Sequence, residues 1–216
     1  MGLRDLKEDI KTIYEKDPAA TNIFEIICCY PGFQALAFHR LAHKLYNWKI
    51  SVLPRMISNF SRFITGIEIH PGAQIGKRFF IDHGMGVVIG ETTIVGDDCL
   101  IYQGVTLGGT GKEHGKRHPT LKDNVVVGAG AKVLGNITLG NNARIGAGSV
   151  VISDVPDDST VVGVPGRIVV QKGEKRSQLN HNFIPDPVTC ALNRMKYEIE
   201  EIKEQLKECK DKIEHS

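Results

Sequence analysis

Two short polar segments of the chain hold a histidine beside a charged residue, Asp82-His83 and Arg117-His118. Histidine suits the role of general base at neutral pH, because its unperturbed pKa lies near ~6.5. The planar guanidinium of Arg117 can grip a carboxylate through two parallel hydrogen bonds. The two segments are therefore candidates for a site that takes a proton from a substrate and binds its carboxylate.

An aliphatic residue returns every six positions on both sides of these segments. Seven of the twelve are followed directly by Gly, and the set is Ile69, Ile75, Ile81, Ile89, Val95, Ile101, Leu107, Val127, Val133, Leu139, Ile145 and Val151. Neither the 3.6-residue period of a helix nor the simple alternation of a hairpin sheet gives this spacing. The six-residue period predicts a solenoid, in which each short strand stacks on the strand one coil away.

Both polar segments fall where the repeat is interrupted. The step from Ile81 to Ile89 is eight residues, two more than the repeat. The step from Leu107 to Val127 is twenty, interpreted as eighteen plus two, and it contains the polar, glycine-rich stretch 109–119. We therefore expect loop 109–119 to protrude, and each interruption to add two residues without changing the register of the core.

The repeat separates segments of different character. Residues 1–65 carry helical patterns, residues 66–170 are expected to form the repeat domain, and the polar segment 171–187 is expected to be a linker. Prolines and glycines place the expected helices at about 3–16, 21–30, 33–47 and 52–64. From 188 to 214 apolar residues alternate at spacings of four and three, which favours a coiled coil over a single amphipathic helix.

Composition excludes several classes of partner. Lys and Arg number 27 against 25 Asp and Glu, so the charge gives no argument for a nucleic-acid or anionic membrane partner. The N-terminus is too charged for a signal peptide, and no apolar run reaches the ~18 residues that span a bilayer. The five cysteines are odd in number and lack metal spacing, which indicates a reduced, cytoplasmic compartment; Cys28 and Cys29 are expected to be buried on a helix.

Several longer motifs together resemble one family. They are Asp17-Pro18-Ala19-Ala20, Gly32-Phe33-Gln34-Ala35-Leu36, the stretches 82–92 and 103–112, Arg117-His118-Pro119 and Gly128-Ala129-Gly130-Ala131-Lys132. From about residue 10 to 168 the chain resembles the bacterial serine O-acetyltransferases, which are left-handed parallel β-helix acyltransferases of the hexapeptide-repeat type. The resemblance implies an α+β fold and transfer of acetyl from acetyl-CoA to the hydroxyl of L-serine. The product would be O-acetyl-L-serine, for cysteine biosynthesis.

The resemblance also implies residue roles. His83 is the principal base, His118 lies across the same site, and Glu68 stands where the family has an Asp that orients the base. The residues that it assigns to serine are Asp17, Pro18, Asp82, Thr110 and Arg117, with the two aspartates facing the ammonium group. Glu91 and His70 fit structural and functional roles equally well, whereas His39 and His43, one helical turn apart, are expected to be structural.

Acetyl-CoA is the implied co-substrate, and no metal is implied. Small residues let backbone groups approach the amides of the pantetheine arm, and the candidates are Gly108, Gly109, Gly128, Ala129, Ala147 and Gly148. Tight solenoid corners need Gly and Ala in any case, so these residues alone also have a structural explanation. Arg144, Lys132 and Arg167 are the candidates for the phosphates, and the resemblance favours Arg144.

The resemblance implies a homotrimer with active sites between subunits, and inhibition by cysteine. Many relatives dock a terminal Ile into the downstream sulfhydrylase; this chain ends Ile213-Glu214-His215-Ser216, so that complex is not expected. The residues alone leave three alternative functions open. A trimeric zinc carbonic anhydrase would use the i, i+4 pair His114 and His118. A sugar or antibiotic acetyltransferase would share the fold, and a non-catalytic scaffold would leave both insertions without purpose.

Overall fold

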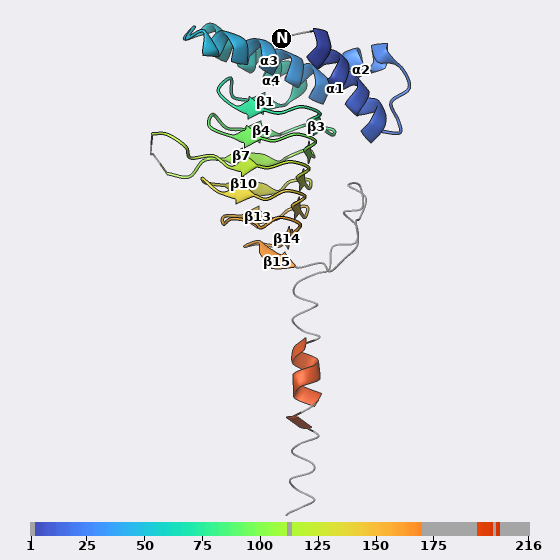
Figure 1. Ribbon diagram of the computed structural model, residues 1–216, viewed down its shortest axis with the longest axis vertical. Helices are drawn as coiled ribbons and strands as arrows, with labels where there is room; N and C mark the ends of the chain where they lie inside the picture. Colours follow the sequence, from blue (N-terminus) through green and yellow to red (C-terminus); the bar gives the residue numbers. More distant parts are fainter. Residues whose placement is uncertain (1–2, 112–113, 170–193, 201, 204–216) are drawn as a thin grey trace, which may run out of the picture. The chain divides into compact units, whose positions relative to one another are not determined.

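The computed structural model describes residues 3–111, 114–169, 194–200 and 202–203 (Figure 1). Contacts divide the chain into two compact units, residues 1–182 and 183–216. In the second unit the described residues are helical, and the apolar side chains of Met195, Ile199 and Ile202 are exposed. The expected linker 171–187 and the other heptad residues, Val188, Leu192, Leu206, Cys209 and Ile213, lie outside the described residues.

The first unit begins with four helices, α1 (Leu3–Lys16), α2 (Ile23–Cys29), α3 (Pro31–Asn47) and α4 (Leu53–Thr65). Asn22 caps α2 by accepting a hydrogen bond from the backbone N–H of Glu25 at 2.9 Å. Gly66 ends α4 with φ of +71°, a conformation that glycine adopts without strain, and the chain then enters the first coil. No helix among the described parts of the chain combines the length and apolar character that a bilayer crossing requires.

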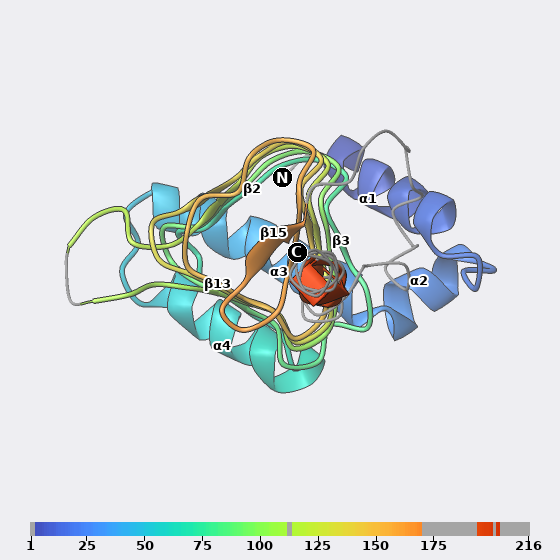
Figure 2. The same cartoon turned by 90° about the horizontal axis from the view of Figure 1, so that it is seen from below.

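The strands form three sheets, and Figure 1 shows their strands stacked one coil on the next, whereas Figure 2 views the same coils from below. Sheet A contains β1 (Glu68–Ile69), β4 (Val88–Ile89), β7 (Thr106–Gly108), β10 (Lys132–Leu134) and β13 (Val150–Val151). Sheet B contains β2 (Gln74–Ile75), β5 (Ile94–Val95), β8 (Thr120–Leu121) and β11 (Thr138–Leu139). Sheet C contains β3 (Phe80–Ile81), β6 (Leu100–Ile101), β9 (Val126–Val127), β12 (Arg144–Ile145), β14 (Thr160–Val162) and β15 (Arg167–Val169). Neighbouring strands pair in parallel, except β14 with β15.

The six-residue repeat supplies the core of this β-helix. Ile89 pairs in register with Leu107, and Leu107 with Val133, and all three side chains are fully buried. Of the twelve repeat positions, only Ile75 is partly exposed. The predicted solenoid is therefore confirmed, with one column of aliphatic side chains along each sheet.

The two interruptions differ in size, and the expectation for the second was wrong. Val88 pairs with Glu68, twenty residues earlier, and with Thr106, eighteen residues later, so the first interruption adds two residues as expected. Lys132 pairs with Thr106 across twenty-six residues, so loop 109–119 adds eight rather than two. Leu121, buried on β8, occupies the repeat position that the sequence count missed. An insertion of eight residues and an insertion of two differ by six, the length of one repeat. The spacing of the aliphatic residues alone therefore cannot distinguish the two insertions.

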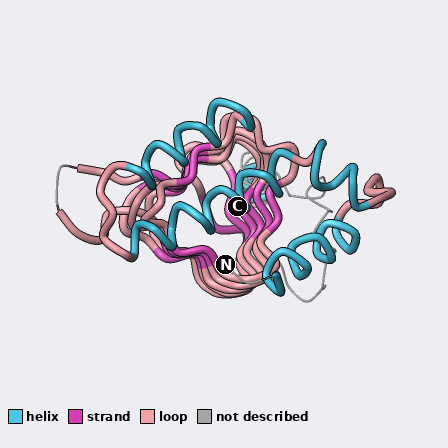
Figure 3. The backbone as a smooth tube through the Cα atoms, turned by 90° about the horizontal axis from the view of Figure 1, so that it is seen from above, coloured by secondary structure: helices cyan, strands magenta, loops and turns pink. Residues whose placement is uncertain are grey.

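Helices cover one end and one face of the β-helix. Figure 1 shows α3 and α4 beside the first coil, and Figure 3 shows helices lying across this end of the β-helix. On the outer face of sheet C, Phe80 and Leu100 pack with Ile13 of α1 and Ile26 of α2. Because Ile26 takes the inward side of α2, Cys28 and Cys29 are exposed, which corrects the expectation that they are buried.

Candidate active site

The predicted site residues divide between the two edges of sheet A. Its strands are parallel, so the turns that enter them share one edge and the turns that leave them share the other. We call the entering side the helix edge; it carries Asp82-His83. We call the leaving side the loop edge; it carries Arg117-His118 at the end of loop 109–119. Figure 1 shows this loop projecting on the side of sheet A opposite to α1 and α2.

On the loop edge, an ion pair holds Arg117. Its guanidinium bonds Glu91, whose other carboxylate oxygen accepts a hydrogen bond from the hydroxyl of Tyr46 at 3.4 Å. The hydrogen bond from Arg117 to Glu91 lowers the pKa of the Glu91 carboxyl. Glu91 therefore orients the guanidinium of Arg117. The sequence had left the role of Glu91 open. Tyr46 was not anticipated, because only the fold brings α3 above the second coil.

His118 lies beside Arg117, and its side chain is 8% exposed. Its Nδ1 contacts Thr92, with the hydroxyl oxygen at 2.9 Å and the backbone nitrogen at 3.3 Å. Burial and the neighbouring Arg117 lower the pKa of His118, whereas Glu91 opposes that shift. Burial and Arg117 thus favour the neutral form of the ring. Thr92 was not found from sequence, because a threonine in a turn carries no signal of its own.

A cleft of about 450 Å³ opens at the loop edge, and Arg117 and His118 line it. Gly108 and Gly109, predicted to bind the co-substrate, line the same cleft with Arg55, Glu68 and His70. Glu68 pairs with Arg62 of α4 at 2.9 Å, and among the described residues no hydrogen bond or ion pair joins it to His83. The predicted assistance of His83 by Glu68 thus stays a prediction. Thr110 is exposed in the adjoining loop, near Gly135 of the next coil.

On the helix edge, two carboxylates approach one tyrosine. The hydroxyl of Tyr30 donates to Asp17 at 2.7 Å. Burial is the largest cause that raises the pKa of Tyr30. The hydrogen bond to Asp17 raises it further, and the negative charge of Asp82 has a smaller effect in the same direction. Asp17, the exposed Pro18 and Asp82 were predicted to bind serine, and the fold brings the two carboxylates to one region. His83 follows Asp82 as an exposed side chain in a turn with φ of +59°. Tyr30 was missed by sequence reasoning.

The other predicted co-substrate residues lie away from the loop edge. Gly128, Ala129, Ala147 and Gly148 occupy turns of the helix edge, two coils in succession. Gly148 is exposed, with φ of +68° and open space where a Cβ would stand. Arg144 on β12 is half-buried, and burial lowers its pKa; Arg167 on β15 is exposed. One chain therefore does not gather these residues with Gly108 and Gly109.

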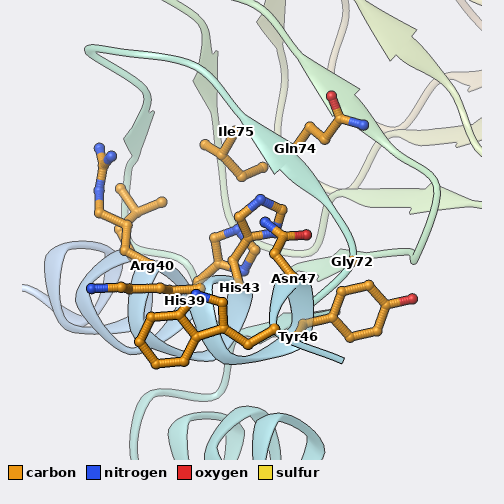
Figure 4. Close-up of a pocket in the computed structure, with 11 residues that line it drawn as sticks. His39, Arg40, His43, Tyr46, Asn47, Gly72, Gln74 and Ile75 are labelled. Carbon is orange, nitrogen blue, oxygen red and sulfur yellow. The ribbon is translucent and has the colours of Figure 1, made fainter. Parts of the chain in front are cut away.

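A second cleft, of about 740 Å³, lies between α3 and the first coil (Figure 4). It contains none of the residues predicted to bind substrate. His39 is buried there, and burial lowers its pKa to about 3. The Nδ1 of His43 lies 2.7 Å from the carbonyl oxygen of Pro71 and donates to it. These contacts fit the structural role expected for both histidines.

Comparison with known proteins agrees with this arrangement. Residues 118–153 match the family model described as bacterial transferase hexapeptide (six repeats). The serine acetyltransferase of Bacillus subtilis is 58% identical over 214 residues, which cover 99% of each chain. That of Synechococcus elongatus is 60% identical over 203 residues, 94% of this chain and 83% of the relative.

Solved structures show the same likeness. The serine acetyltransferase of Neisseria gonorrhoeae superposes with a TM-score of 0.77 at 44% identity, covering 80% of this chain and 66% of the other. That of Brucella abortus in complex with coenzyme A gives a TM-score of 0.75 at 44% identity, covering 79% and 68%.

The coil and the clefts at its edges define the class of hexapeptide-repeat transferases with a left-handed parallel β-helix. Within that class, the chain belongs to the serine acetyltransferase family. The expected family and fold class are confirmed, and with them the assignment as an acyltransferase.

Proposed function

We propose that the protein transfers the acetyl group of acetyl-CoA to the hydroxyl of L-serine, giving O-acetyl-L-serine and CoA for cysteine biosynthesis. The observation that carries the proposal is 58% identity to a serine acetyltransferase across both full chains. Solved relatives include one in complex with serine and one with coenzyme A. Free cysteines at Cys28, Cys29 and Cys99 agree with a cytoplasmic location.

In the proposed reaction, Asp17 and Asp82 hold the serine ammonium group and Arg117 holds its carboxylate. His83 takes the hydroxyl proton as the serine oxygen bonds to the thioester carbon. The carbonyl π electrons move onto oxygen and form a tetrahedral oxyanion. When the C–S bond breaks, the sulfur leaves with the electron pair and takes up the proton that His83 removed, so the histidine ends neutral.

The site is proposed to form between subunits of a homotrimer. Residues for each substrate lie on both edges of sheet A, so a neighbouring β-helix would have to bring its loop edge to this chain's helix edge. Exposed apolar side chains support association. On α4, Phe63 is 87% exposed and Met56 61%, while the small residues Ser58 and Ser61 face inward. Such a surface is unusual for a monomer.

The co-substrate would run along the groove between two subunits. Gly108 and Gly109 of one chain and Gly128, Ala129, Ala147 and Gly148 of the next would face the pantetheine arm. Arg144 and Arg167 are the proposed contacts for its phosphates. No described group of three His, Cys, Asp or Glu side chains has the spacing of a metal site, and the proposed reaction uses no metal.

A thiol-release assay with acetyl-CoA tests the proposed function. We expect turnover with L-serine and formation of O-acetyl-L-serine, identified by mass spectrometry. Galactosides and chloramphenicol serve as acceptors for the alternative transferases on this fold. Turnover with one of these acceptors and none with L-serine would show that the substrate assignment is wrong.

A further inference from the structure

Thr92 follows β4 and bonds the end of loop 109–119 from the neighbouring coil. Its hydroxyl oxygen accepts hydrogen bonds from the backbone N–H groups of Arg117 at 3.0 Å and His118 at 3.2 Å. The same oxygen lies 2.9 Å from Nδ1 of His118. The backbone nitrogen of Thr92 lies 3.3 Å from that Nδ1. One residue therefore holds both the backbone and the ring of His118.

These four contacts determine which ring nitrogen of His118 carries the proton. A backbone N–H can only donate, so Nδ1 must be the acceptor of the Thr92 amide. A hydroxyl oxygen has two acceptor lone pairs, and the two backbone donors occupy both. The Thr92 hydroxyl proton is then left to point at Nδ1. Nδ1 is therefore unprotonated, and the neutral ring carries its proton on Nε2.

The protonated nitrogen faces the cleft at the loop edge. A Cβ placed on Gly109 would lie 3.1 Å from Nε2, and one placed on Gly90 would overlap the ring. Both glycines line the cleft with Gly108. Nε2–H thus lies where the proposed thioester arm would pass, and the ring has no free lone pair to accept a proton from serine.

We propose that Thr92 is a positioning residue that holds His118 as an Nε2–H donor to the carbonyl oxygen of the acetyl thioester. This role rests on the proposed function. As serine oxygen attacks, the carbonyl oxygen gains the π electron pair and Nε2–H stabilises it. When the carbonyl re-forms, the C–S bond breaks and the hydrogen bond to His118 weakens. His118 gives up no proton, and His83 alone acts as the base.

Imidazole ¹⁵N NMR tests the tautomer without any turnover. The chain has eight histidines, and loss of one ring system in His118→Gln assigns His118. We expect its neutral ring to show an unprotonated Nδ1 and a protonated Nε2, and Thr92→Val to weaken this preference. A protonated Nδ1 in the unaltered protein would overturn the proposal. Failure of serine acetylation with the expected tautomer would instead count against the proposed function.

Three threonine variants test the positioning role. Thr92→Val should lower kcat ~10- to 100-fold with a serine KM within a few-fold, because it misplaces a donor whose complete loss costs ~10²- to 10³-fold. Thr92→Ser should recover kcat to within about threefold, since the hydroxyl returns. The matched control is Thr93→Val. Thr93 is fully buried, and within the described chain its hydroxyl has no hydrogen-bond partner, so this variant should keep full activity. Unchanged kcat in Thr92→Val would overturn the proposal.

Variants of His118 keep the proposal testable if Thr92→Val does not fold. His118→Gln retains an amide N–H near the place of Nε2 and should be ~10-fold more active than His118→Ala. Its kcat/KM should keep the acid limb of the pH profile, because the base, His83, is intact. Loss of that limb in His118→Gln would identify His118 as the base and refute the assignment.

Discussion

His83 is exposed in a turn with φ of +59°, whereas His118 is 8% exposed and bonded to Thr92 through Nδ1. A general base needs a free lone pair within reach of the proton, and an oxyanion donor needs a fixed N–H. The exposed ring of His83 suits a general base, and the fixed ring of His118 suits an oxyanion donor. At the scale of single residues, we therefore propose proton removal as the task of His83 and charge stabilisation as the task of His118.

Replacing His83 tests the first task. His83→Ala should lower kcat by ~10²- to 10⁴-fold, the usual contribution of a positioned base. The KM for L-serine should change less, because Asp17, Asp82 and Arg117 remain. Steady-state kinetics by thiol release measures both constants. His114→Ala, at an exposed histidine of loop 109–119, is the control and should keep its activity. Full activity in His83→Ala would remove that residue from the mechanism.

Gly90 tests the placement of the His118 ring. A Cβ at this position would overlap Cδ2 and Nε2 of the imidazole, so Gly90→Ala should displace the ring from the cleft. We expect kcat to fall ~100-fold, as for the loss of one oxyanion donor. Circular dichroism and light scattering should show an unchanged fold and mass. A variant with normal kcat would mean that the ring does not need its place beside Gly90.

At the scale of elements, α3 carries a histidine that makes stability depend on pH. Burial holds the pKa of His39 at about 3, below the ~6.5 of an unfolded chain. Between these values the unfolded chain binds more protons, so the stabilising contribution is complete above ~6.5 and decreases as pH falls. The free energy of unfolding should therefore decline below pH 6.5, by at most ~1.4 kcal/mol per pH unit from this one group.

His39→Gln removes the titrating group and should flatten that decline. Urea unfolding at fixed protein concentration, from pH 7.5 to 4, measures the slope for the unaltered protein and the variant. His114→Gln, at an exposed loop position, is the matched control and should leave the slope unchanged. Equal slopes for His39→Gln and the unaltered protein would show that His39 does not titrate in this way.

The β-helix could be predicted from sequence, because an aliphatic residue recurs at each core position and pairs in register with the aliphatic residue one coil away. The size of loop 109–119 could not, since an eight-residue insertion and a two-residue one differ by a whole repeat. Asp82-His83 and Arg117-His118 stood out as interruptions. Thr92, Tyr30 and Tyr46 did not, because each acts on a residue at least thirteen positions away through a contact that only folding creates.

At the scale of the whole molecule, sheet A separates the predicted site into two halves. Asp17, Asp82 and His83 belong to the helix edge, and Arg117 and His118 to the loop edge. Parallel strands keep these edges apart within one chain. We therefore propose that two copies complete each active site, one copy contributing each edge.

Complementation between two inactive variants tests this claim most directly. His83→Ala and His118→Ala chains, co-expressed with different tags and purified through both, should form mixed trimers. In a trimer that contains both variants, one of the three interfaces carries both intact histidines, so activity should return to about one third of the unaltered level. If each site lay within one chain, the mixed protein would be no more active than the single variants, and that result would contradict the account.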